Sequence, residues 1–405
     1  MSVRFRLGAM MFLQYAIWGS WTPVLSDYLK NTLGYSGAQF SLIYSLLPLA
    51  TIIAPFIGGQ VADRYFPSQK VVAWLQLLGG VFLVLIALTT TYGTMVWLML
   101  AYCLLYAPTL ALTNSIAFIN LQNSEQEFGK IRVWGTIGWI AAGYLLTLWR
   151  IGGQSVSGLA FKGDMLLLAA VFSLIMGVQS FTLPNTPPRK EGQKPWAFLE
   201  AMRMMKDRNF LLFIIIAFIV ATELMFYYIL TAPFLTSEKI GVSSTILPWV
   251  MTIAQVAEIF VLAFLLPYLI SRIGLRKILV LGILAWPLRY IIFAVGQPAW
   301  LVIASLALHG FCFVFFFTAA FIYVDTIAPR DIRHSAQSLI TLVTYGLGNY
   351  LGSLFAGWIH DLFTRNEVTN WTHVFLVPCF LTVLCAFVFL LFFRERGAAQ
   401  PAGTQ

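Results

Sequence analysis

The sequence carries very little charge. Only 10% of its 405 residues are Asp, Glu, Lys or Arg, whereas 60% are hydrophobic. A soluble domain has about 25% charged residues, so a water-soluble globular protein is excluded. The apolar runs are roughly 20 residues long, which is the length that a helix needs to cross a bilayer core. Because the backbone has no water to bond to in that core, these runs must be helical. The composition therefore predicts an all-α integral membrane protein.

Residues typical of metal sites and catalytic motifs are also scarce. The four cysteines, Cys103, Cys312, Cys379 and Cys385, all fall within apolar runs, which favours packing over a disulfide or a metal site. The four histidines are scattered along the chain, and no G-x-S-x-G motif or phosphate-binding glycine loop is present. These absences argue against an enzyme, a metal site and a bound cofactor.

The net charge of +9 raises the question of nucleic acid as a partner. The basic residues, however, occur singly or in small groups between apolar runs. If both termini are cytoplasmic, most Lys and Arg fall on the cytoplasmic side, as the positive-inside rule requires. We therefore expect a multi-pass membrane protein with both termini in the cytoplasm and no nucleic-acid partner.

The apolar runs predict twelve transmembrane helices in two groups of six. A polar, proline-rich stretch separates the groups, so we expect a six-helix bundle at 1–183, a cytoplasmic linker at 184–208 and a second six-helix bundle at 209–405. The expected helices are 7–28, 40–62, 71–91, 94–120, 131–150, 164–183, 209–236, 244–270, 277–296, 299–324, 334–360 and 371–393.

The loop GGQVADRYFPSQK, residues 58–70, is weakly repeated as LPYLISRIGLRK in the second half. Its G-x-x-x-D-R element and the lysine after it resemble the signature loop of the major facilitator superfamily. The resemblance implies the major facilitator fold of two six-helix halves. It also implies a cytoplasmic charge clasp of Asp63, Arg64 and Lys70 that breaks as a transporter changes state. The alternative is an ordinary short loop.

Ionisable residues inside the predicted helices include Arg132, Glu223, Glu258, Arg289 and His309. Charged groups in a bilayer cost about 3 kcal/mol or more, so they usually face a cavity and carry function. Such a carboxylate can bind and release a proton, which a proton-coupled carrier needs. The alternatives are buried structural pairs, for example between Glu223 and Arg289.

Spacing groups some of these residues on common helix faces. Gln255 and Glu258 are three apart and share one face. Arg132, Thr136 and Trp139 form a stripe along another helix, although Arg132 can instead snorkel at the cytoplasmic end.

An aromatic tract and a third face complete the candidates. His309 and Phe313 are one turn apart in a phenylalanine-rich tract that suits a flat ring, although phenylalanine is also common in lipid-facing surface. Two residues turn a helix by about 200°, so Glu223 is expected to point away from Met225 and Tyr228.

Segments along nearly the whole chain resemble the nucleoside:proton symporter family within the major facilitator superfamily. The resemblance implies a secondary active transporter that imports nucleosides across the bacterial inner membrane by alternating access, coupled to protons. It implies no cofactor, and the expected partners are a nucleoside, a proton and the lipid bilayer, with the chain a monomer. The matching segments are FLQYAIWGSW (12–21), YAPTLALTNSIAF (106–118), IRVWGTIGW (131–139), AQVAEIF (254–260) and IYVDTIAPRDIRHSAQ (322–337).

The same resemblance implies a nucleoside site midway across the membrane, with Glu258 as the proton-coupling group. Two departures stand out: Met225 and Tyr228 replace amides of the family pattern, and Val314 replaces an aspartate linked to proton coupling. Three alternatives therefore stay open: an uncoupled nucleoside facilitator, a carrier of a sugar or another small metabolite, and a sensor that has lost transport. The implied substrate-binding residues are Arg132, Thr136, Trp139, Met225, Tyr228, Gln255, Glu258, His309 and Phe313.

Overall fold

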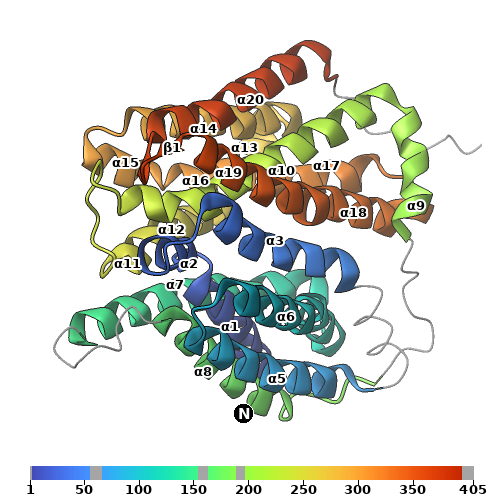
Figure 1. Ribbon diagram of the computed structural model, residues 1–405. Coiled ribbons are helices and arrows are strands. Elements are labelled where there is room, and N and C mark those ends of the chain that lie inside the picture. Colours follow the sequence, from blue (N-terminus) through green and yellow to red (C-terminus); the bar gives the residue numbers. More distant parts are fainter. Residues whose placement is uncertain (1, 55–65, 154–162, 188–196, 395–405) are drawn as a thin grey trace, which may run out of the picture.

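The computed structural model describes residues 2–54, 66–153, 163–187 and 197–394, and most of them are helical. The first half (blue to green in Figure 1) packs as one bundle below the second half in that view. Its elements are α1 (Val3–Trp21), α2 (Leu25–Asp27), the π-helical turn η1 (Tyr28–Thr32), α3 (Gly37–Ala54), α5 (Ser68–Leu88), α6 (Tyr92–Asn120), α7 (Ser124–Gly153) and α8 (Asp164–Ser180).

The second half follows a short linker helix, α9 (Ala197–Ala201), and the 3-10 turn η3 (Met202–Lys206). Three of its long helices are continued through π-helical segments. The elements are α10 (Arg208–Leu235); α11 (Leu247–Met251), α12 (Ile253–Phe260), η4 (Val261–Leu265) and α13 (Leu266–Ile273); α14 (Leu275–Val295); α15 (Ala299–Ser305), α16 (Leu308–Cys312), η5 (Phe313–Thr318) and α17 (Ala319–Ile327); η6 (Arg330–Ile332); α18 (Arg333–Thr341), η7 (Leu342–Gly348) and α19 (Asn349–Leu362); β1 (Thr364–Arg365) and β2 (Val368–Thr369); and α20 (Trp371–Phe392).

Ten of the described helical segments are long and apolar enough to cross a membrane. α8, with 17 residues, is apolar but shorter, and α1 is not among the ten. Both lie where a span was predicted and pack against each other within the first half. The predicted all-α membrane architecture is therefore confirmed, whereas the total of twelve spans is not. The division at 183/184 and 208/209 stays a prediction.

Two local features differ from the prediction. The first helix was expected to run to residue 28, but α1 ends at Trp21, because Pro23 lacks the N–H that would continue the helical hydrogen bonds. The short antiparallel pair of β1 and β2 was not predicted, and its turn contains Asn366 and Glu367 at positive φ. Both features lie at the same end of the molecule.

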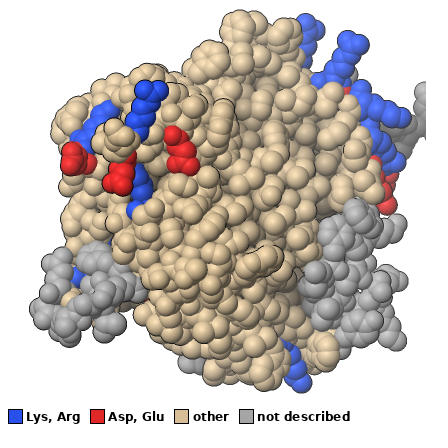
Figure 2. All heavy atoms as spheres, viewed as in Figure 1, with Lys and Arg blue, Asp and Glu red and all other residues tan. Residues whose placement is uncertain are grey.

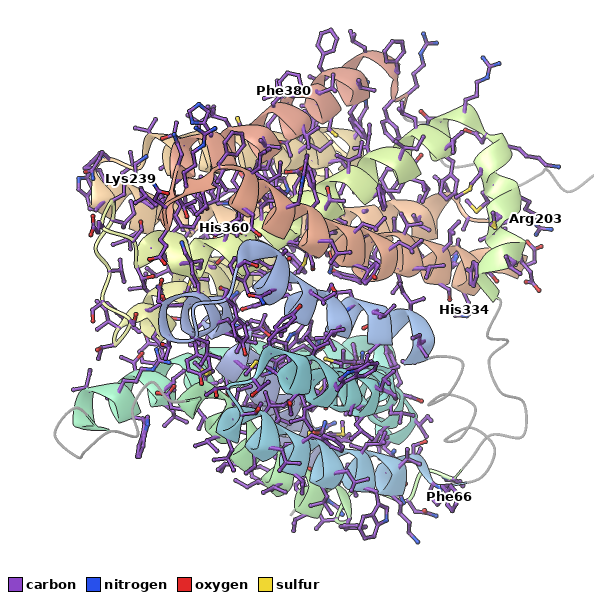
Figure 3. All side chains as sticks on the ribbon, viewed as in Figure 1. Phe66, Arg203, Lys239, His334, His360 and Phe380 are labelled. Carbon is purple, nitrogen blue, oxygen red and sulfur yellow. The ribbon has the colours of Figure 1, made fainter. Side chains whose placement is uncertain are left out.

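The outer surface of the bundle is apolar. Figure 2 shows charged side chains at the margins of this face, with a broad uncharged region between them. Large side chains in that region point outward, for example Phe380, which is 69% exposed and labelled in Figure 3. Since exposed apolar patches of this extent are rare on soluble monomers, the surface is suited to lipid.

The close contact of α1 with α7 determines where the predicted stripe on α7 lies. A side chain on Gly138 would collide with the backbone carbonyl of Phe12, and one on Gly19 would collide with Trp139. The absence of side chains therefore lets the two backbones approach closely. α7 is held against α1, with one of its faces directed at the second half, where it contacts α11 and α12.

Candidate substrate site

The two halves place opposite charges near each other at their interface. The guanidinium of Arg132, on α7, lies 3.9 Å from the ring centroid of Tyr15. Glu258, on α12 of the other half, is close enough to Arg132 for electrostatic attraction, but no ion pair joins these two described residues. Both side chains are partly exposed. A cation from one half and a carboxylate from the other therefore interact where the halves meet.

Gln255 extends the polar surface beside Glu258. It lies one turn earlier on α12 and is 6% exposed. Its side-chain oxygen has no hydrogen-bond partner among the described residues. Buried amide oxygens are nearly always bonded, so this oxygen retains capacity for a ligand.

The α7 stripe continues from Arg132 toward α11. Thr136 is half-buried, and Trp139 is buried with its ring 5.5 Å from that of Trp18 in an edge-to-face arrangement. Trp139 also lines a narrow hollow between the halves, together with Thr252. Arg132 and Trp139 therefore lie where the halves meet, and the substrate-binding role of the stripe stays a prediction.

The α10 residues differ in what they offer. Tyr228 is partly exposed, and its hydroxyl lies within electrostatic reach of the Glu258 carboxyl group. Its ring meets that of His309 edge-to-face at 5.8 Å. Met225 is 5% exposed and contributes only apolar volume.

His309 lies behind the interface. It is fully buried, and its Nδ1 is 3.3 Å from Nη1 of Arg289. Its ring stacks on Phe313 at 5.6 Å, and Phe313 is the partly exposed member of the pair. In this arrangement Phe313 presents the ring surface, and His309 supports it. Val314 is fully buried and supplies no proton-binding group.

The sequence interpretation missed Tyr15 and Tyr345. Tyr345 is electrostatically coupled to both Arg132 and Glu258 and stacks on Phe317 at 6.0 Å. Tyr345 lies in a glycine-rich segment whose pattern indicates helix packing. The sequence interpretation therefore did not consider it as a site residue.

The predicted charge clasp stays a prediction. Asp63 and Arg64 lie outside the described residues. Lys70 is exposed in the first turn of α5.

Hydrogen bonds between the halves gather at one end of the molecule, which we call the closed end. Asp27 of the first half accepts hydrogen bonds from the hydroxyls of Thr236 (2.6 Å) and Ser244 (2.9 Å) of the second. The neighbouring Arg150 donates to the carbonyl of Ser244 (2.7 Å). Beside these groups lies a cavity of about 270 Å³ lined in part by Asp27 and Arg150. In Figure 1 this end is at the left, and α9 lies at the opposite, linker end.

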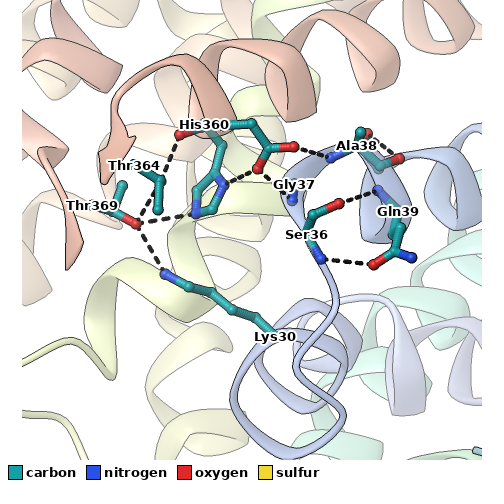
Figure 4. A network of polar contacts seen from close by, with 10 residues as sticks. Lys30, Ser36, Gly37, Ala38, Gln39, His360, Thr364 and Thr369 are labelled. Carbon is teal, nitrogen blue, oxygen red and sulfur yellow. Dashed lines mark hydrogen bonds and ion pairs between the residues drawn. The ribbon is translucent and has the colours of Figure 1, made fainter. Parts of the chain in front are cut away.

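A second polar network closes the same end (Figure 4). Asp361, on α19, accepts from the backbone N–H groups of Gly37 (2.6 Å) and Ala38 (2.8 Å), the first residues of α3. Ser36 and Gln39 cap this helix reciprocally. A carboxylate at a helix N-terminus is stabilised by the orphan N–H groups and by the helix dipole. Asp361 therefore joins the two halves electrostatically.

His360 and Lys30 extend this network. The imidazole Nδ1 of His360 lies 3.1 Å from Asp361, and its Nε2 lies 3.2 Å from the Thr369 hydroxyl. Lys30, from the first half, donates to the same hydroxyl at 3.2 Å. Burial lowers the pKa of Lys30, while Asp27 and Asp361 oppose that shift. Lys239 and His360 mark this end in Figure 3, and Arg203 and His334 mark the linker end.

We expect Asp361→Asn to weaken the closed end. The substitution removes the charge that faces the N-terminus of α3, an interaction worth about 1 kcal/mol. The closed population should fall about fivefold relative to the open one. Spin labels on Thr32→Cys and Glu238→Cys, on opposite sides of the closed end, would report this as a longer distance. The exposed Glu367→Gln is the control, and an unchanged distance distribution for Asp361→Asn would show that its bonds do not hold the halves together.

Comparison with known proteins agrees with this geometry. A family model described as nucleoside H+ symporter matches residues 1–398. The chain is 36% identical to the putative nucleoside transporter YegT of Escherichia coli (strain K12), over 96% of this chain and 93% of the relative. It is 31% identical to the nucleoside permease NupG of the same organism, over 100% and 99%. A crystal structure of nucleoside transporter NupG superposes with a TM-score of 0.85 at 28% identity, covering 98% of this chain and 100% of that one.

Proposed function

This chain belongs to the nucleoside H+ symporter family, and from that premise we propose that it imports nucleosides by alternating access, with Glu258 as a proton-coupling group. The family is one of transporters, so the chemistry is binding and release without covalent steps. The observation that carries the proposal is the placement of Arg132 and Glu258 on opposite halves, within electrostatic reach of each other. A ligand between them touches both halves and so senses their relative motion.

The residues around that space fit the parts of a nucleoside. Flat bases stack on aromatic rings, and Trp139 and Phe313 supply such rings from opposite halves. Ribose hydroxyls are donors and acceptors that suit the Glu258 carboxylate and the unpartnered Gln255 oxygen. Tyr228 adds a hydroxyl where the family pattern has an amide, which supports a shifted preference among nucleosides.

The closed end supports one state of the transport cycle. Hydrogen bonds that the carboxylates of Asp27 and Asp361 accept hold the halves together there. We propose that this end faces the outside of the inner membrane, with both termini and the linker in the cytoplasm. α1 and α8 would complete a set of twelve spans in a monomeric carrier, with the lipid bilayer around it.

Uptake into proteoliposomes tests the proposed function. Labelled uridine, adenosine and xanthosine are offered with and without an inward proton gradient. Each coupled proton is worth about 1.4 kcal/mol per pH unit, so we expect about tenfold accumulation per unit for one proton. Equilibration without accumulation would identify an uncoupled facilitator, consistent with the buried Val314. No movement of any nucleoside would reject the substrate class and favour a sugar.

A further inference from the structure

Glu223 is a buried carboxyl group that the substrate site does not use. It lies in the middle of α10, is 0% exposed, and neither of its carboxyl oxygens has a hydrogen-bond partner among the described residues. An ionised carboxylate without a partner in an apolar interior is so unfavourable that the group takes up a proton instead. In this arrangement Glu223 therefore holds its proton.

The described groups that face Glu223 do not form hydrogen bonds with its carboxyl group. From α14, the hydroxyl of Tyr290 bonds to the backbone carbonyl of Glu223 rather than to its carboxyl group. The guanidinium of Arg289, the preceding residue on α14, lies 5.2 Å from the centroid of this ring. From α20, the nearest titratable groups are the thiols of Cys379 and Cys385.

The third long helix packed against α10, which η7 and α19 form, adds no charge there. α19 meets α10 where Gly352 lies against Thr222 and where Phe355 packs on Phe226. None of these residues has a titratable side chain, and Tyr345 of η7 interacts with Glu258 and Arg132 instead. The only charged group near Glu223 among the facing residues just described is thus Arg289.

Arg289 is a buried positive charge that forms no ion pair with a carboxylate among the described residues. Its guanidinium remains charged in any protein environment, and two of its nitrogens, Nε and Nη2, are unpartnered in that part of the chain. Its contacts include the rings of Tyr227 (4.4 Å), Trp286 (4.6 Å) and Tyr290 (5.2 Å) and the Nδ1 of His309. A rearrangement that brings Arg289 to Glu223 would compensate both charges, and Glu223 would then release its proton.

This cluster also reaches the substrate site. His309 bonds Arg289 on one side and stacks on Phe313 on the other. Movement of Arg289 therefore shifts a ring that faces the space between the halves. A ligand shifts an equilibrium toward the state that binds it more tightly. A proton on Glu223 therefore favours the arrangement in which Glu223 and Arg289 are apart.

We propose that Glu223 is a second proton-binding site, separate from Glu258, whose proton stabilises the arrangement joined at the closed end. The inference rests on the proposed alternating-access function. The bound proton leaves when Glu223 meets Arg289 as the closed end opens. Raising the pH removes the proton, so higher pH favours opening.

The test follows the closed end without any substrate. Spin labels on Thr32→Cys and Glu238→Cys report the distance across it, in full-length protein in lipid nanodiscs; the four native cysteines are buried. The parent carries Glu258→Gln, which removes the other carboxyl from the titration. We expect its closed-to-open ratio to fall as pH rises, by up to about tenfold per pH unit for one proton.

Adding Glu223→Gln should abolish this pH dependence and leave the protein closed. Adding the exposed Glu367→Gln should preserve the dependence. A pH response that survives Glu223→Gln, or a parent that shows none, would overturn the proposal. Glu223→Met serves as a second neutral variant, expected to fold because no hydrogen bond of the carboxyl group is lost. Unfolding of both variants would assign Glu223 a structural role and overturn the proposal too.

Infrared spectroscopy provides a direct measurement of the proton. The carbonyl stretch of a protonated carboxylic acid should disappear on Glu223→Gln, whereas its persistence would show that Glu223 is ionised. Neither readout needs a nucleoside. A wild-type protein that fails to transport nucleosides would reject the proposed function. Its infrared spectrum would still show whether Glu223 is protonated.

Discussion

Replacing Glu258 by glutamine is expected to lower the steady-state accumulation of nucleoside about tenfold for each pH unit of imposed gradient. Glutamine keeps the shape of the side chain and a hydrogen-bonding group but removes one titrating group from the interface between the halves. Exchange of labelled for unlabelled nucleoside should continue, because binding does not require the proton to be lost. Proteoliposome uptake and counterflow measured on the same preparation separate the two effects.

The exposed Glu238→Gln is the matched control, since it removes a carboxylate of the same chemistry at the surface. Accumulation that is unchanged in Glu258→Gln would remove the proton role from this residue. Loss of both accumulation and exchange would instead assign Glu258 to nucleoside binding alone.

Asp164→Ala is expected to destabilise the protein by about 3–5 kcal/mol. Asp164 and Arg150 form a two-pronged ion pair, 2.8 Å at each contact, with side chains only 3% and 2% exposed. Removing the carboxylate leaves a buried guanidinium without its counter-charge. Thermal unfolding in detergent should show the loss as a large drop in Tm.

Two comparisons separate this effect from a general loss of charge. Asp331→Ala breaks the ion pair between Asp331 (66% exposed) and Arg203 (55% exposed). Its loss should lower the free energy of unfolding by less than about 1 kcal/mol. Arg150→Met combined with Asp164→Leu should recover most of the stability, because a well-packed apolar pair can replace a buried ion pair. If Asp164→Ala lowers Tm no more than Asp331→Ala does, the buried ion pair contributes no more to stability than the exposed one.

Spacing along single helices predicted which candidate residues share a helix face. Gln255 and Glu258 share a face because they are three residues apart on α12, and the α7 stripe follows from the helical period. Glu223 and Tyr228 do point to different surroundings, the first among buried groups of the second half and the second toward Glu258. These results depend only on helical geometry, which is local.

Contacts between helices far apart in the chain were beyond such reasoning. His309 and Phe313 are one turn apart, yet one is buried against Arg289 and the other faces the interface. Asp361 binds the start of α3, more than 300 positions earlier. No periodicity relates such pairs, because their proximity results from how the bundles pack.

The sequence by itself determined that this protein is helical and embedded in lipid. The reason is that scarce charge and long apolar runs admit no other stable state for the backbone. Only the tertiary structure decided which ionisable groups meet. Arg132 lies within electrostatic reach of Glu258 across the halves, whereas no hydrogen bond or ion pair joins the carboxyl group of Glu223 to Arg289 among the described residues. Charge pairing falls off with distance and depends on burial, and both quantities exist only once the helices are packed.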